Sequence, residues 1–130
     1  MDVKEYQKKA LRTNASNYKE ITSRFAHEDV INIIHAGIGL TTESGEFNDA
    51  LKKHLFYGSK LDTVNLKEEL GDILWYIAIA AESLNTNIKD LMDINIKKLE
   101  SRYPIEFNLE KCLNRDIKKE RKILKGGDCD

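Results

Sequence analysis

The sequence has little proline, little cysteine and no long apolar segment, and each shortage excludes a class of protein. One proline in 130 residues argues against a turn-rich β fold. The two cysteines, Cys112 and Cys129, form neither a metal-type spacing nor a disulfide framework. The longest apolar run is residues 73–81, whereas a membrane-spanning helix needs about 20 residues. Since the N-terminus also lacks the apolar core of a signal peptide, we expect a cytoplasmic protein without a membrane partner.

Neither sign of charge dominates the sequence. Lys and Arg number 21 and Asp and Glu number 22, which gives a net charge of -1. This balance argues against binding to nucleic acid through bulk charge. With 41% hydrophobic residues the chain can build one core, and its length corresponds to a single domain, residues 1–130.

Apolar residues recur every three or four positions along most of the chain, which is the spacing of amphipathic helices. Asn65 is the expected N-cap of the third helix, and Thr86 or Asn87 is that of the fourth. Residues 15–27 are expected to form a loop or an irregular turn. The last helix is basic, and we expect the chain after it to fray. The spacing predicts helices over residues 2–14, 28–57, 65–84, 87–102 and 109–124. The predicted fold is therefore all-α, an antiparallel bundle of four core helices with a basic C-terminal helix.

Two pairs of acidic residues stand three positions apart on the second and third predicted helices. At about 100° per residue, Glu43 and Glu46 share one helix face, and so do Glu69 and Asp72. One such pair is common on a solvated helix face, but two pairs beside apolar segments of a helical hairpin are more informative. Facing carboxylates repel one another unless a cation lies between them. Oxygen ligands suit Mg²⁺, so the pairs indicate a metal site that also binds phosphate oxygens.

Other polar residues lie on the same faces of these helices. His35 and Lys53 fall on the carboxylate face of the second helix, and Tyr76 lies one turn after Asp72. A histidine satisfied within the core is an equally good interpretation of His35. Tyr76 is more often a core or interface residue than one that stacks on a base.

The fourth predicted helix carries a polar stripe formed by Asn95, Lys98 and Arg102. Lys and Arg neutralise phosphate charge, and Arg binds phosphate through two parallel hydrogen bonds. A solvated charged face is the alternative interpretation of this stripe.

Together these residues resemble the MazG-like, all-α nucleoside triphosphate pyrophosphohydrolases. The likeness is carried by His35-Ala-Gly-Ile-Gly-Leu-Thr-Thr-Glu-Ser-Gly-Glu46, by Glu68-Glu-Leu-Gly-Asp-Ile-Leu-Trp-Tyr76 and by Asn95-Ile-Lys-Lys-Leu-Glu-Ser-Arg-Tyr-Pro104. It covers about residues 28–107. Residues 108–130 match the family pattern poorly, and we assign this extension no catalytic role.

The resemblance implies hydrolysis of a nucleoside triphosphate between the α and β phosphates, with Mg²⁺ as the cofactor and Mn²⁺ as a substitute. It implies that subunits assemble through an intersubunit bundle, as a homodimer or homotetramer. Glu43 and Glu46 are the candidates for activating the attacking water. By position, the implied metal ligands are Glu43, Glu46, Glu69 and Asp72. The candidate substrate-binding residues are His35, Lys53, Tyr76, Asn95, Lys98 and Arg102.

Several other interpretations stay open. A di-iron carboxylate bundle needs Glu-x-x-His pairs, but none of the three histidines has Glu three positions before it. A helical interaction module could keep the acidic motif without the chemistry. A dUTP or dCTP pyrophosphatase of the same superfamily would share the chemistry and differ in its base pocket. The nucleotide itself stays open, because base discrimination rests on a few hydrogen bonds.

Overall fold

A computed structural model describes residues 1–126, which form helices and no strand. The all-α prediction is confirmed for this part of the chain, while Cys129 and residues 127–130 of the tail expected to fray lie outside it. None of the described helices is long and apolar enough to cross a membrane. The helices are α1 (Val3–Leu11), α2 (Tyr18–Phe25), α3 (Glu28–Tyr57), α4 (Thr63–Ser83), α5 (Ile88–Arg102), α6 (Leu109–Leu113) and α7 (Ile117–Leu124).

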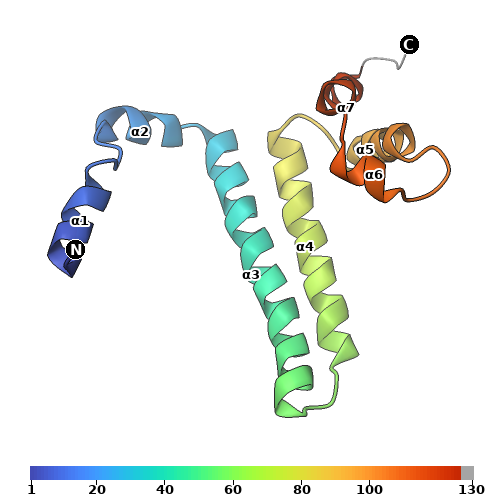
Figure 1. The fold of residues 1–130 in the computed structure, drawn as a ribbon, viewed down its shortest axis with the longest axis horizontal. Helices are drawn as coiled ribbons and strands as arrows, with labels where there is room; N and C mark the ends of the chain where they lie inside the picture. The colour runs from blue at the N-terminus through green and yellow to red at the C-terminus, as the bar shows by residue number, and fades with distance from the viewer. Residues whose placement is uncertain (127–130) are drawn as a thin grey trace.

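The long helices α3 and α4 run antiparallel and pack against each other along their length (Figure 1). Gly58 ends α3 with a φ of 70°, a left-handed conformation that glycine adopts without steric cost. The side chain of Asp62 then begins α4 by accepting hydrogen bonds from the backbone N–H groups of Val64 and Asn65. The prediction that Asn65 caps this helix is therefore wrong, because Asp62 already satisfies the free N–H groups one turn earlier.

Small residues let the two long helices approach closely. Ala36 and Gly39 on α3 and Ala81 on α4 are all buried. A Cβ atom added at Gly39 would lie 2.1 Å from Cε1 of Tyr76, so the tyrosine ring occupies the space that a side chain would fill. This contact fixes the register of α4 against α3, and with it the positions of the acidic residues one turn away.

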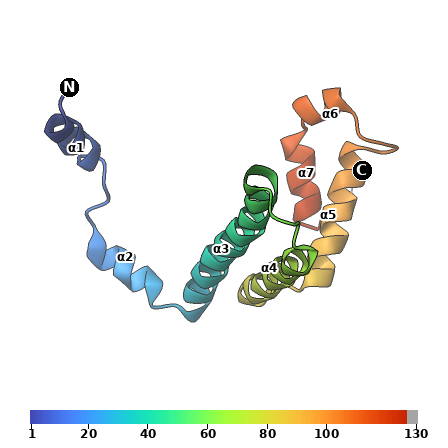
Figure 2. The ribbon, with the colours of Figure 1, turned by 90° about the horizontal axis from the view of Figure 1, so that it is seen from below.

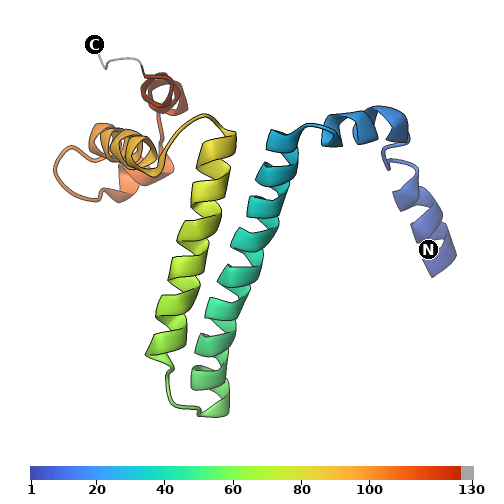
Figure 3. The same cartoon turned by 180° about the vertical axis from the view of Figure 1, so that it is seen from behind.

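The segment expected to be a loop, residues 15–27, mostly forms helix α2. Asn17 precedes the helix and donates a side-chain hydrogen bond of 2.8 Å to Glu20, and the apolar Tyr18, Ile21 and Phe25 follow helical spacing. The prediction failed because Asn, Ser and Thr favour helix starts as well as turns. Helices α1 and α2 lead away from the hairpin, as Figure 3 also shows from behind.

The single basic helix predicted over residues 109–124 is wrong, because α6 and α7 divide this segment. Asn114 ends α6, and the side chain of Asp116 begins α7 by accepting from the Lys119 N–H at 3.0 Å. Two capping residues in the middle of an apolar spacing thus break the helix that the spacing predicts. Helix α7 folds back onto α5 (Figure 2). The predicted N-cap of α5, Asn87, is confirmed, because its side chain accepts a 2.9 Å hydrogen bond from the Asp90 N–H.

Few large apolar side chains are buried within one chain. In residues 1–126 the buried apolar side chains are Ala36, Ala81 and Ile123. The hairpin leaves Ile38, Leu74 and Trp75 more than half exposed. Of the four helices predicted to form a core bundle, only α3 and α4 pack along their length within the chain. Exposed apolar surface of this kind is typical of sites that contact a partner or a ligand.

Candidate metal centre between helices α3 and α4

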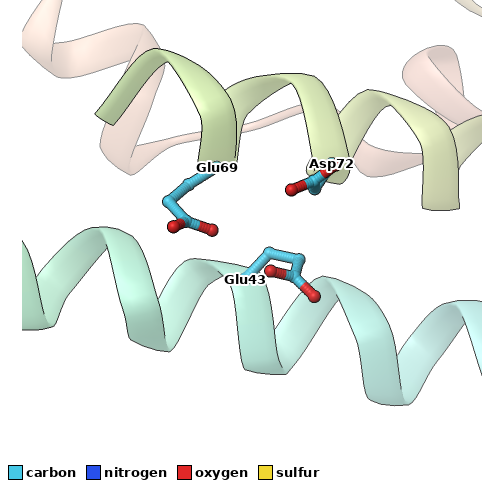
Figure 4. Close-up of side chains that lie close together, drawn as sticks. All are labelled: Glu43, Glu69 and Asp72. Carbon is cyan, nitrogen blue, oxygen red and sulfur yellow. The ribbon is translucent and has the colours of Figure 1, made fainter. Parts of the chain in front are cut away.

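Three carboxylates from two helices meet within the hairpin. One oxygen each of Glu43, Glu69 and Asp72 lies within 4.8 Å of the other two. Figure 4 shows Glu43 rising from α3 toward Glu69 and Asp72 on α4. The antiparallel packing places the middle of α3 opposite the N-terminal half of α4, and the spacing of three residues puts both α4 carboxylates on one face.

Glu69 is the most enclosed member of this cluster. It is only 3% exposed, and one carboxylate oxygen accepts a 2.6 Å hydrogen bond from the amide of Asn65. Burial raises the pKa of Glu69, and the neighbouring Glu43 and Asp72 raise it further against the opposing effect of Asn65. A buried carboxylate next to two others is stabilised by a proton or by a cation. The cluster is therefore a favourable place for a positive ion.

Glu46, the fourth predicted ligand, lies outside this three-carboxylate cluster. It follows Glu43 by three residues on α3, and its side chain is exposed. No ion pair involves Glu46 within residues 1–126. Its carboxylate is thus accessible to water beside the enclosed cluster.

A cluster of three aromatic rings lies further along the same helix pair. The ring of His35 meets those of Tyr76 and Trp75 edge-on, with centroid distances of 5.5 and 6.2 Å. A hollow of about 410 Å³ beside His35 is lined by residues of both helices, among them Asn32 and Ala78. The structure therefore brings two predicted substrate residues, His35 and Tyr76, together, and Tyr76 lies about one helical turn beyond Asp72 on α4.

The basic candidates do not reach the cluster within this chain. Lys53 lies ten residues beyond Glu43, roughly 15 Å along the axis of α3, and pairs with Asp49 at 2.8 Å. Hydrogen bonds from Lys52 and Lys53 lower the pKa of Asp49 to about 2.

The remaining candidates, Asn95, Lys98 and Arg102, lie on α5. This helix leaves the hairpin at the C-terminal end of α4, about 16 Å along the axis from Asp72. Arg102 is bound to Glu120 of α7 by hydrogen bonds of 2.7 and 2.6 Å. One chain therefore keeps its basic stripe and its acidic cluster apart.

The contacts that two residues, Asn65 and Glu120, make with the candidate site residues were not predicted from the sequence. Asn65 lies four positions before Glu69, a spacing that places both side chains on one helix face. This spacing could have predicted the hydrogen bond from Asn65 to Glu69. Glu120 gave no such signal, because its partner Arg102 is 18 positions away and meets it only after the chain reverses.

The carboxylates on the facing helices of the hairpin define an all-α protein with a candidate metal site. Comparison with known proteins identifies its family. Residues 36–107 match the MazG nucleotide pyrophosphohydrolase domain, so the chain belongs to that family. The Gene 37 protein of Mycobacterium phage L5 is 30% identical over 79 residues, which are 58% of this chain and 69% of that protein. No solved structure matches the chain. The matched region contains all four predicted metal ligands and ends before α6.

Proposed function

We propose that this protein hydrolyses a nucleoside triphosphate between the α and β phosphates, giving the monophosphate and pyrophosphate. The observation that carries the proposal is the cluster of Glu43, Glu69 and Asp72 inside the region that matches the family. Family membership supports a nucleotide substrate. The hollow beside His35, whose ring contacts that of Tyr76, supports a base-binding place on the same helix pair.

The donor set of the cluster fits Mg²⁺, with Mn²⁺ as a substitute. Carboxylate oxygens are the ligands that hard divalent cations prefer, and the buried Glu69 gains most from a nearby positive charge. We propose that Glu43, Glu69 and Asp72 hold the ion and that Glu46 is the fourth ligand. The ion supplies neutralisation of the triphosphate charge and Lewis-acid polarisation of the phosphate.

Glu43 or Glu46 is the proposed general base. The carboxylate of Glu46 is exposed and forms no ion pair in residues 1–126, which favours it over Glu43. It would take a proton from a water molecule as the water oxygen bonds to the α phosphorus. The bond from the α phosphorus to the bridging oxygen breaks, and pyrophosphate leaves with that oxygen. Phosphate contacts are proposed for Lys53, Asn95, Lys98 and Arg102, because cations stabilise the charge that develops on the leaving group.

A second copy of the chain is proposed to complete the site. Within one chain the α5 stripe does not reach the cluster, while Ile38, Leu74 and Trp75 remain exposed on the hairpin. Covering apolar surface is the main driving force for association, and most soluble oligomers are symmetric assemblies of one chain. A homodimer or homotetramer would bury these side chains and supply basic residues from a neighbouring subunit.

The test is pyrophosphate release from a panel of canonical, modified and deoxy nucleoside triphosphates, with Mg²⁺ and with EDTA. We expect Mg²⁺-dependent release that falls at least ~100-fold in Glu46→Gln and in Asp72→Asn, because a ligand or base is lost. Glu68→Gln is the matched control, since Glu68 is exposed and lies outside the cluster. Release from dUTP or dCTP alone would identify the narrower pyrophosphatase. No release from any nucleotide by the folded protein, or normal rates in both variants, would reject the proposal.

A further inference from the structure

The C-terminal extension forms a buried ion-pair network with the end of α5. Glu120 of α7 is 5% exposed, and its carboxylate accepts bonds from both Nε and Nη2 of Arg102, at 2.7 and 2.6 Å. Arg115 donates from Nη2 to the same carboxylate at 2.6 Å. Arg102 belongs to the segment that matches the family, whereas Glu120 and Arg115 lie beyond it. The extension thus acts directly on a residue of the family region.

The network leaves one edge of the Arg102 guanidinium free of Glu120. Nε and Nη2 are bound to Glu120 and Nη1 is not, while the ring of Tyr103 lies beside the guanidinium with its centroid 5.6 Å from Cζ. The Arg102 side chain is 15% exposed and lines a pocket of about 230 Å³ together with Lys111 and Lys119. The guanidinium is therefore fixed in its plane, with two N–H groups of Nη1 still available to an acceptor.

The charges in the network do not cancel. Two arginines surround one carboxylate, and their hydrogen bonds lower the pKa of Glu120 to about 2, Arg115 having the larger effect. Two positive charges and one negative charge leave an excess of one positive charge. At the pocket Lys111 and Lys119 add two further positive charges, while Asp116 adds one negative charge, so the lining stays positive. An anion that binds at Nη1 would therefore be close to a net positive charge.

We infer that Glu120 is a positioning residue, which fixes Arg102 so that Nη1 is presented to a phosphate oxygen of the substrate. This inference rests on the proposed function, in which Arg102 contacts the triphosphate. A long side chain that is ordered before binding loses less entropy when the ligand arrives, so the affinity rises. If Glu120 instead competed with phosphate for Arg102, its removal would strengthen substrate binding.

The first experiment compares KM and kcat for pyrophosphate release by the wild type, Glu120→Ala and Glu120→Gln. We expect Glu120→Ala to raise KM about tenfold, the value of roughly one charge-assisted hydrogen bond, with kcat changed by less than about twofold. Glu120→Gln keeps an acceptor oxygen and is expected to raise KM less. Glu110→Ala is the charge-matched control, because Glu110 is exposed and forms no ion pair in residues 1–126. Its KM should equal that of the wild type.

A lower KM in Glu120→Ala would overturn the inference and identify competition. Unchanged KM would overturn it as well, and so would a loss of kcat alone in proportion to the unfolded fraction seen by circular dichroism. If Glu120→Ala does not fold, the KM of Glu120→Gln is compared with that of the wild type instead.

A second measurement separates this inference from the proposed function. Calorimetric binding of inorganic tripolyphosphate in EDTA needs neither hydrolysis nor the acidic cluster. We expect it to weaken about tenfold in Glu120→Ala and in Arg102→Met, and to be unchanged in Glu110→Ala. A wild type that binds tripolyphosphate in this way but hydrolyses no nucleotide would reject the hydrolase and keep the positioning role. If the wild type is active and Glu120→Ala binds tripolyphosphate with the same affinity as the wild type, the positioning role alone is rejected.

Discussion

At the scale of single residues, the contact between Gly39 and Tyr76 decides how closely α3 and α4 pack. Replacing Gly39 by Ala should destabilise the fold by about 1–3 kcal/mol, because the new Cβ would lie 2.1 Å from a ring atom of Tyr76. This cost exceeds the gain of roughly 1 kcal/mol that Ala brings to a helix. Urea unfolding of the purified protein measures the difference.

Gly37→Ala is the internal control for that prediction. A Cβ atom at Gly37 would meet no atom of residues 1–126 within 4 Å apart from the nearby backbone of its own helix, so only the gain in helix propensity remains. We expect Gly37→Ala to be neutral or to stabilise by up to about 1 kcal/mol. If both variants shifted the urea midpoint equally, the close packing at Gly39 would be refuted.

At the scale of helices, the network around Glu120 joins α7 to α5 and should be visible in acid. The folded-state pKa of Glu120 is about 2 against an ordinary value of 4.5, so the unfolded chain binds its proton more readily. The stability that ionised Glu120 contributes is complete above pH 4.5 and is lost as pH falls toward about 2. Unfolding free energies measured across this range should therefore fall more steeply for the wild type than for Glu120→Gln. Equal slopes would contradict the network.

Sequence patterns predicted the long helices well and the short ones poorly. Helix α3 coincides with the predicted residues 28–57, because a long apolar periodicity averages over local exceptions. Helices α2 and α7 have eight residues each, so each contains too few apolar positions to define a helical period. Their boundaries depend on capping by single side chains such as Asp116, and Asn and Asp are equally common in turns.

The acidic site was also partly predictable from the sequence. The i, i+3 spacing and an antiparallel hairpin suffice to bring Glu43 near Glu69 and Asp72. The pairing of Arg102 with Glu120 was not predictable, because it depends on the path of the chain between α5 and α7. Local spacing describes contacts within a helix or between adjacent helices, whereas this contact joins elements that meet only after the chain turns.

At the scale of the whole molecule, the exposed apolar side chains of the hairpin should determine the state of association. Leu74 on α4 is 55% exposed in the single chain, so Leu74→Asp removes few contacts within it. If a second copy covers this face, the variant buries a charge at the interface and the assembly dissociates. Light scattering after size-exclusion chromatography should show a dimer or tetramer for the wild type and a monomer for Leu74→Asp.

Ile105→Asp is the matched control for this change, because Ile105 is 96% exposed and lies outside the hairpin. We expect the control to keep the wild-type mass, since the two substitutions introduce the same charge and differ only in position. Pyrophosphate release should fall in Leu74→Asp and not in Ile105→Asp, because the proposed site needs the α5 residues of another subunit. A wild type that is monomeric and active, or a monomeric Leu74→Asp variant with full activity, would mean that one chain holds the complete site.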